Sequence, residues 1–175
     1  GHTISGLHIN KTEGVCCGLF GVCAGTIENL TVTGSITCVA ADDHSAVGGI
    51  AGLVVGGHIS NCAADLTIDS NRLSLGMYAG GVVGQIKEGT IRCCRSSTRF
   101  EHVLGNFLYL GGVVGGVVGH IDGDGVILES VNRGSVCGGC KAAGGIAGWI
   151  SMDHQGPDPL TVVDCCLNLG DVIQS

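Results

Sequence analysis

A short segment in which two glycines enclose an aliphatic residue and one further residue recurs five times along the chain. Its first glycine stands at positions 18, 49, 81, 116 and 145, so that successive copies lie 29 to 35 residues apart. Four of the five copies are preceded by one more glycine. A repeat of this length is typical of a structural unit that cannot bury its apolar face alone and must stack on its neighbours. The chain is therefore predicted to be an array of stacked units.

A second shared segment follows each copy of the first. It covers residues 26–30, 58–62, 90–94, 126–130 and 162–166, and its second residue is Ile or Val every time. Residues 3–7 read as a sixth copy of this segment without its glycine partner. We therefore expect residues 1–175 to form a single repeat domain that begins and ends in mid-repeat.

Inside each copy the apolar residues follow a period of two. The residues one and five places after the first glycine are apolar, and the residue three places after it is always glycine. This pattern is typical of a short strand with one buried face, with a glycine where another part of the chain approaches closely. In the second segment the next inward residue comes three places after the Ile or Val, which predicts a corner. One buried ladder is expected to consist of Leu19, Ile50, Val82, Val117 and Ile146.

Short strands separated by corners and repeated about every 32 residues predict an all-β fold, a parallel β-solenoid or β-helix. We expect about five to six coils, and a right-handed coil because parallel crossovers have that hand. Equivalent residues of neighbouring coils would then lie about 4.8 Å apart. A Greek-key sandwich is the alternative, since it also uses many short strands, but its strands would not repeat side-chain identity in register.

The paired glycines, the Gly-aliphatic-any-Gly core and the downstream segment that begins at Thr26 together resemble the GLUG motif, a repeat family named for its Gly-Leu-any-Gly core. Only residues 18–21 keep the Leu, and the other copies replace it with Ile or Val. The resemblance covers nearly the whole chain. Similar repeats occur in large secreted or surface-anchored bacterial proteins, including adhesin-like proteins and the non-catalytic regions of some immunoglobulin-A-cleaving metallopeptidases. It therefore implies an extracellular or cell-surface location in a bacterium, and the family has no catalytic residues to carry over.

Charge and composition exclude several other classes of function. The net charge is −7 and no cluster of Lys and Arg exists, so binding to nucleic acid is not expected. No apolar run approaches the roughly 20 residues that span a bilayer, so membrane insertion is not expected either. Neither end shows a basic segment followed by an apolar one, and the first residue is not Met. We therefore expect a mature product or an excised fragment.

The chain holds eleven cysteines, an odd number that cannot pair completely within one chain. Cys62, Cys94 and Cys166 share one inward repeat position, and we expect them to be buried as small apolar side chains. Disulfides between coils are an alternative, because a separation of about 4.8 Å lies within the range that a disulfide spans. In other copies this position is assigned to Leu7, Leu30 and Ser130.

Three further patterns could carry chemistry, but each lacks part of its motif. The Cys137–Cys140 pair has no second ligand pair for zinc, so it is expected to be a loop with free thiols or a local disulfide. Residues 120–125 resemble a calcium loop but lack the bidentate Glu, and a polar corner is the expectation. Residues 42–44 are expected to be a second solvated corner. No catalytic, cofactor-binding or metal-binding residue is predicted.

These observations favour a non-enzymatic structural or adhesive repeat region of a bacterial surface or secreted protein. The alternative is an accessory β-helical region of a secreted hydrolase, either a metallopeptidase or a carbohydrate-active enzyme. Phe107 and Tyr109 lie in the longest insertion, so they are the predicted ligand residues. The expected partners are a host or cell-surface protein or glycan, together with flanking repeats or a second copy stacked end to end, because open sheet edges recruit other chains.

Overall fold

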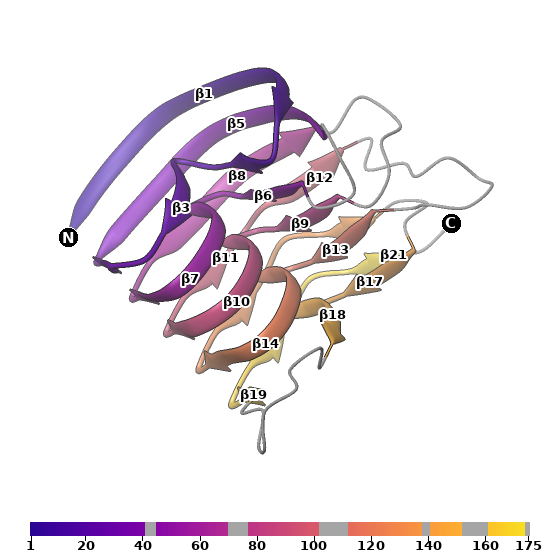
Figure 1. Ribbon diagram of the computed structural model, residues 1–175. Helices are drawn as coiled ribbons and strands as arrows, with labels where there is room; N and C mark the ends of the chain where they lie inside the picture. The colour runs from indigo at the N-terminus through magenta and orange to yellow at the C-terminus, as the bar shows by residue number, and fades with distance from the viewer. Residues whose placement is uncertain (41–44, 70–76, 102–111, 138–140, 152–160, 174–175) are drawn as a thin grey trace.

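The structure is a computed structural model that describes residues 1–40, 45–69, 77–101, 112–137, 141–151 and 161–173 (Figure 1). Throughout these ranges the regular elements are β-strands, and no helix occurs. All strand pairings are parallel and join neighbouring coils, as β7 (Ala51–Ser60) pairs with β10 (Val83–Arg92). The prediction of an all-β, parallel β-solenoid is confirmed.

Three sheets form the walls of the solenoid. The first sheet contains β1 (His2–Gly14), β5 (Leu30–Ala40), β8 (Ala63–Asp69), β11 (Arg95–Ser96), β12 (Arg99–Glu101), β15 (Val131–Asn132) and β20 (Leu167–Asn168). The second contains β2 (Cys16–Cys17), β6 (Ala46–Gly48), β9 (Tyr78–Gly80), β13 (Val113–Gly115) and β17 (Ala142–Gly144). The third contains β3 (Phe20–Cys23), β4 (Thr26–Glu28), β7, β10, β14 (Val118–Leu128), β18 (Ala147–Ser151) and β19 (Val162–Asp164). A separate pair joins β16 (Val136–Cys137) to β21 (Val172–Ile173).

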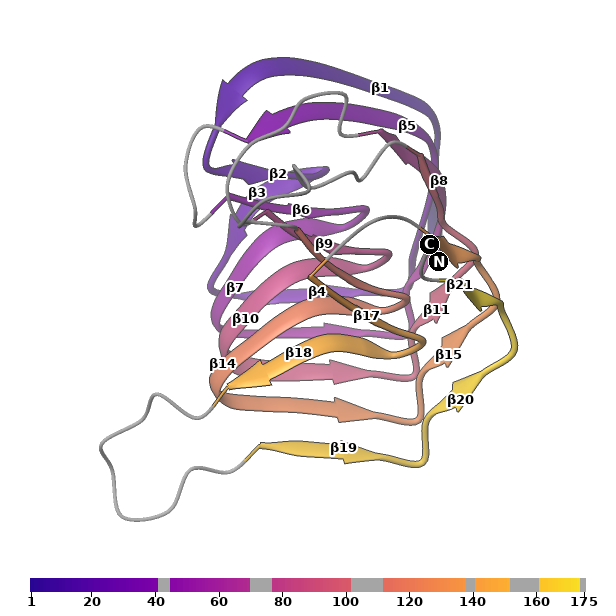
Figure 2. The same cartoon turned by 90° about the vertical axis from the view of Figure 1, so that its right-hand side faces the viewer.

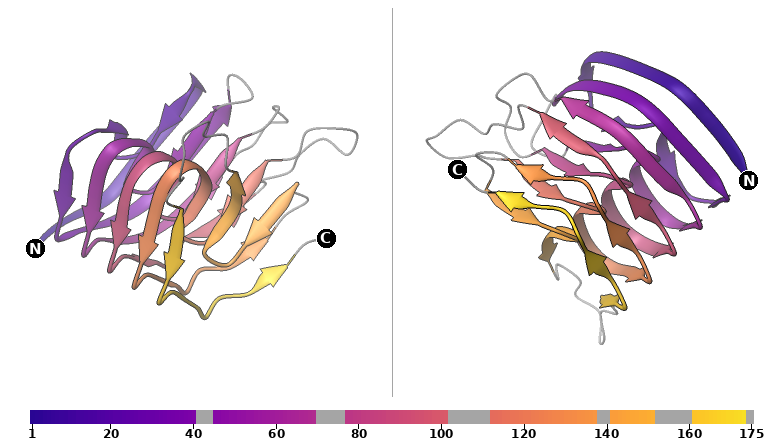
Figure 3. Two further views of the ribbon diagram at one scale, coloured as in Figure 1. Left: turned by 60° about the horizontal axis from the view of Figure 1, so that its bottom comes forward. Right: turned by 180° about the vertical axis from the view of Figure 1, so that it is seen from behind.

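In each coil the chain runs through the second sheet, then the third, then the first, before it enters the next coil (Figure 2). The third-sheet strands β7, β10 and β14 curve strongly and stack side by side as a row of arches (Figure 3). The fold has about four turns of about 32 residues, fewer than the five to six expected. The physical reason is that a turn is complete only when all three walls are present, and the five strands of the second sheet delimit four such turns.

The predicted ladder after the first glycine of each repeat is confirmed in its register. The backbone N–H of Ile50 donates to Val82, that of Val82 to Val117, and that of Val117 to Ile146, each over 2.9 or 3.0 Å. The three middle members are fully buried, because a coil covers them on either side. Leu19 and Ile146, at the two ends of the ladder, are partly buried and pack against the same core.

The glycine three places after the first glycine of each repeat lies near the start of a third-sheet strand and faces the backbone of the second sheet. A Cβ built on Gly84 would meet the backbone nitrogen of Val47 at 2.5 Å, and one built on Gly52 would meet that of Cys17 at 2.6 Å. Real Cβ atoms do not come so close to another backbone. The predicted close approach at this repeat position is therefore confirmed.

The predicted corner lies between the third and first sheets and is formed by one residue with left-handed backbone conformation in each coil. Only Asn among the residue types found there adopts positive φ readily, so the Cys and Glu members are held there by the fold. The five corner residues are Asn29 (φ 56°), Asn61 (51°), Cys93 (51°), Glu129 (51°) and Cys165 (53°).

The assignment of residues 3–7 as a sixth copy of the corner segment is wrong. In the structure Thr3 pairs with Thr31 and Ile4 with Val32, so this stretch continues the first sheet beyond the corner. Leu7 pairs with Gly34 and does not share the position of Leu30. Residues 3–7 form no corner. Their residue with positive φ, Gly6 (70°), lies within a bulge of β1.

Candidate functional site

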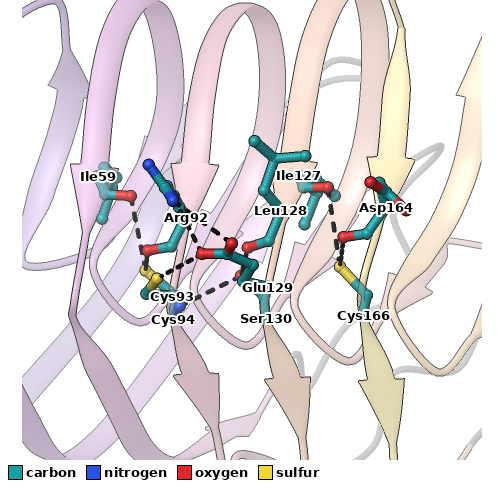
Figure 4. Close-up of polar contacts among 10 residues, drawn as sticks. All are labelled: Ile59, Arg92, Cys93, Cys94, Ile127, Leu128, Glu129, Ser130, Asp164 and Cys166. Carbon is teal, nitrogen blue, oxygen red and sulfur yellow. Dashed lines mark hydrogen bonds and ion pairs between the residues drawn. The ribbon is translucent and has the colours of Figure 1, made fainter.

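The corner brings thiols, carboxylates and a guanidinium group from consecutive coils to one edge of the solenoid (Figure 4). On its outer side the Cys93 thiol donates to Oε2 of Glu129 over 3.0 Å. Arg92 donates to both oxygens of the same carboxylate, through Nε over 3.0 Å and through Nη2 over 3.4 Å. All three side chains are exposed to solvent. The group is therefore a surface cluster whose members come from neighbouring coils.

The electrostatics of this cluster keep its thiol protonated. The hydrogen bond from Arg92 lowers the pKa of the Glu129 carboxyl, and the same carboxylate raises the pKa of the Cys93 thiol. One coil further on, the Asp164 carboxylate raises the pKa of Cys165. Since the thiolate is the reactive form of cysteine, neither outer thiol is suited to act as a nucleophile at neutral pH.

On the inner side of the corner the thiols and one hydroxyl form hydrogen bonds that repeat from coil to coil. The Cys94 thiol donates to the carbonyl oxygen of Arg92 over 3.3 Å, and it lies 3.6 Å from the carbonyl oxygen of Ile59 in the preceding coil. Ser130 donates to the carbonyl oxygen two residues before it in the same way, over 2.8 Å. The thiols of Cys62 and Cys166 also donate to the carbonyl oxygen two residues before them, each over 3.2 Å. These side chains stabilise the four corners that follow the first, where Leu30 stands instead, and link each of them to the preceding coil.

Two pairs of buried thiols lie close enough to shift each other's pKa. In the pair from neighbouring coils, the interaction with Cys94 lowers the pKa of Cys62 to about 7, while the pKa of Cys94 is raised. In the second pair, which joins β2 to β5, the interaction with Cys38 lowers the pKa of Cys17 to about 7. In each pair, one thiol therefore loses its proton more readily than its partner.

A second polar group surrounds His120 in β14. The imidazole Nδ1 lies 3.3 Å from Nε2 of Gln85, and Nε2 lies 2.8 Å from Oγ of Ser151. Tyr78 stacks on the imidazole with ring centroids 4.3 Å apart, and Trp149 meets it edge to face at 6.3 Å. The amide nitrogen of Gln85 can only donate a hydrogen bond, so in this orientation of the amide Nδ1 of His120 accepts. The proton of the neutral imidazole is then on Nε2, which donates to the hydroxyl group of Ser151. In this arrangement the imidazole does not take a proton from that serine.

Burial decides the charge of this histidine. The His120 side chain is almost completely covered, and the loss of hydration lowers its pKa, an effect that the nearby Asp122 carboxylate opposes. The ammonium group of Lys141 lies 4.0 Å from the centroid of a Trp149 ring, which places a positive charge beside the cluster. His120 is therefore neutral at pH 7.

Most residues that sequence analysis singled out do not enter these groups. Phe107 and Tyr109 lie outside the described residues, so their assignment as ligand residues stays a prediction. The same holds for residues 42–44 and for Cys140. Residues 120–125 lie within β14 and do not form the expected polar corner, and Gly123 (φ 96°) lies at the register shift between β10 and β14. No three His, Cys, Asp or Glu side chains of the described ranges are grouped as metal ligands.

Sequence analysis missed the His120 cluster, although the repeat contains a signal for it. Gln85, His120 and Trp149 all stand four places after the first glycine of their repeats, where the earlier copies carry Val22 and Leu53. Parallel in-register stacking places such residues beside each other. The change from apolar to polar and aromatic residues at this one position marks where the cluster forms.

The comparisons with known proteins give one finding. Residues 43–69 match the family model of the GLUG motif, and this segment contains the second glycine copy and the second corner. The resemblance to GLUG-motif repeats is thereby confirmed. Searches of curated proteins and of solved structures each returned no significant match. In the described part of the chain, no helix has the length and apolar character required to span a bilayer.

Proposed function

We propose that this chain is a non-enzymatic structural and adhesive repeat region of a bacterial surface or secreted protein, and that its solenoid stacks end to end on further coils. The GLUG motif at residues 43–69 and the repeating coil support a repeat region. The resemblance to repeats of surface proteins supports the location. The stacking rests on one observation, namely that core positions become exposed in the last coil.

The exposure is seen by following two core ladders into the last coil. Ile121 is fully buried, whereas Ile150, its partner in the next coil, is 47% exposed. Ile127 is likewise buried, and its partner Val163 is 40% exposed. The last strands of the sheets pair on one side only within the described ranges (Figure 3). An uncovered apolar layer beside unpaired parallel strands is the surface that another coil of the same repeat would cover.

The occupant we propose is the first coil of a second copy of this chain. That coil exposes core positions too, since Ile4 is 37% exposed and its partner Val32 is buried. Phe20 is 42% exposed, whereas its partner Ala51 is buried. Joining unlike ends is a heterologous contact, which does not close and therefore produces linear rods. With right-handed crossovers, each added copy would continue the same coil.

The non-enzymatic part of the proposal is supported by the arrangement of the candidate groups. With the Gln85 amide nitrogen donating to Nδ1 of His120, Nε2 donates to Ser151, and in this arrangement the pair is not a nucleophile and its base. The outer thiols Cys93 and Cys165 lie beside carboxylates that raise their pKa values. Among the inner thiols, Cys62 and Cys94 are buried, as expected, whereas Cys166 in the last coil is only partly buried.

The stacking is tested by sedimentation velocity over a concentration series under reducing conditions. We expect species of increasing mass for the wild type and a monomer for Ile150→Lys, which places a charge in the exposed layer. Val55→Lys is the matched control, because Val55 is 40% exposed on the outer side of an interior coil, and it should associate like the wild type. A wild type that is monomeric at every concentration would overturn the stacking, as would unchanged association of Ile150→Lys.

The adhesive role is tested separately with the Ile150→Lys variant, whose monomeric state simplifies binding measurements. The labelled variant is applied to a printed glycan array and to immobilised cell-surface proteins. Saturable binding to a glycan or protein is the expected result. Failure to bind any of them would remove adhesion from the proposal and leave the structural role to be judged by the sedimentation experiment.

A further inference from the structure

Cys62 and Cys94 are neighbours in register on adjacent coils. The residues that follow them, Ala63 and Arg95, are paired in the first sheet, and the N–H of Arg95 donates to the carbonyl oxygen of Cys62 over 2.9 Å. Neighbouring parallel strands are about 4.8 Å apart, which lies within the roughly 4.4–6.8 Å between Cα atoms that a disulfide spans. Both side chains are buried in the core, and the two thiols lie close enough to shift each other's pKa. The spacing of the two residues therefore permits a disulfide between coils.

The environment of the pair also supplies an attacking group. In the closed corner the interaction with Cys94 lowers the pKa of Cys62 to about 7, so Cys62 is the thiol of the pair that loses its proton first. A thiol with a pKa near the ambient pH is well suited to attack a disulfide. The exposed thiols of Cys93 and Cys165 lack this property, since carboxylates raise their pKa values.

We propose that Cys62 and Cys94 are a redox modification site, at which a small-molecule disulfide of the oxidised glutathione class links two neighbouring coils covalently. The Cys62 thiolate attacks one sulfur of the oxidant, forms a mixed disulfide and releases one small thiolate. The Cys94 thiolate then attacks the Cys62 sulfur of the mixed disulfide and releases the second. Two protein thiols thereby lose two protons and two electrons, and the oxidant is reduced to two thiols.

Burial makes this reaction conditional. Cys62 is 2% exposed and Cys94 is 1% exposed, so the oxidant reaches Cys62 only when the corner at Asn61 opens. Closing the bond also costs the hydrogen bonds from the two thiols to the carbonyl oxygens of Ser60 and Arg92. A disulfide formed at such a cost is more easily reduced than an unstrained one. The link is therefore reversible, and it is independent of the proposed adhesive role.

The cross-link can be mapped without ambiguity in a Cys93→Ser variant. Cleavage after Lys and Arg and before Asp leaves Cys62 as the sole cysteine of residues 43–64 and Cys94 as the sole cysteine of residues 93–95. The variant is incubated with oxidised glutathione at pH 8, quenched with acid, alkylated, digested and analysed by mass spectrometry. We expect the two peptides to be linked, and to separate after treatment with a reductant.

The matched control is Cys93→Ser combined with Cys94→Ser, since Ser130 shows that serine fits this corner position; circular dichroism verifies that both proteins are folded. The control should yield no linked peptide. Oxidation should raise the unfolding midpoint of the Cys93→Ser variant by about 5 °C relative to its reduced form, and it should not raise that of the control. Recovery of Cys62 and Cys94 as alkylated thiols, or of either in a disulfide with another cysteine, would overturn the proposal.

Discussion

The thiol of Cys94 donates to the carbonyl oxygen of Arg92 over 3.3 Å and so closes the corner around the residue between them, Cys93, whose φ is 51° (Figure 4). Ser130 closes the next corner with its hydroxyl group. Cys94 is buried, as the sequence predicted. The hydrogen bond adds a second role, since it holds a backbone conformation that Cys93 seldom adopts.

This second role predicts how Cys94 tolerates substitution. Cys94→Ser keeps a donor at the same place and should change the free energy of unfolding by less than about 1 kcal/mol. Cys94→Ala loses the donor and leaves a small cavity, so it should cost about 1 to 2 kcal/mol. Urea unfolding in the presence of a reductant measures both variants. If serine costs as much as alanine, the side-chain hydrogen bond does not stabilise the corner.

The left-handed corner residues predict a stabilising substitution. Cys93→Asn places at φ 51° a residue that tolerates this region, and Asn61 already donates to Asn29 over 2.5 Å at the equivalent positions of two earlier coils. We expect a gain in the free energy of unfolding of up to about 1 kcal/mol. Cys93→Val should lose about 1 to 2 kcal/mol, because a β-branched residue is strained at positive φ. Equal unfolding midpoints for the two variants would contradict this account of the corner.

The close approach of the second and third sheets predicts that Gly84 cannot be replaced. The Cβ of Gly84→Ala would lie 2.5 Å from the backbone nitrogen of Val47 and 2.7 Å from the carbonyl oxygen of Gly52. Both neighbours are backbone atoms inside the sheets, so relief requires the coils to separate, and we expect a loss of about 3 kcal/mol. Gly25→Ala is the matched control, since its Cβ would meet nothing within 4 Å; it should stay within about 0.5 kcal/mol of the wild type.

The buried imidazole predicts a dependence of stability on pH. Burial lowers the pKa of His120 below the value of about 6.5 that it has in the unfolded chain. Between these two values the unfolded chain binds more protons than the folded one, so the free energy of unfolding rises with pH in this window. The stability that the folded chain gains by keeping His120 neutral is complete above pH 6.5, and it is lost as the pH falls below 6.5.

Urea unfolding at pH 7.5, 6.5 and 5.5 measures the free energy of unfolding of the wild type and of His120→Gln. The difference between the two free energies is followed as a function of pH. The wild type should lose stability relative to the variant as the pH falls. His58→Gln changes an exposed histidine and should leave the pH dependence of the wild type in place. A difference between wild type and His120→Gln that stays constant over this range would show that His120 does not titrate differently in the two states.

The sequence by itself determined the parallel coil, its period, the Leu19–Ile50–Val82–Val117–Ile146 ladder and the closely packed glycines. The reason is repetition: an alternation read once in a single strand is a weak signal, but the same residue types at the same offsets in five copies leave few other arrangements. The corner could be placed for the same reason. The cysteines at the inner corner position could also be located, because in-register stacking turns a shared offset into a shared position in space.

Only the tertiary structure decided where this repetition ends and which outward side chains meet. Residues 3–7 resemble the corner segment, but hydrogen bonds to β5 draw them into the first sheet, and pairing along a whole strand outweighs a local likeness of five residues. Tyr78 and His120 belong to different sheets, so no offset within one strand predicts that their rings stack. Such contacts depend on how the walls of the solenoid meet, which is a property of the packed coil and not of the repeat alone.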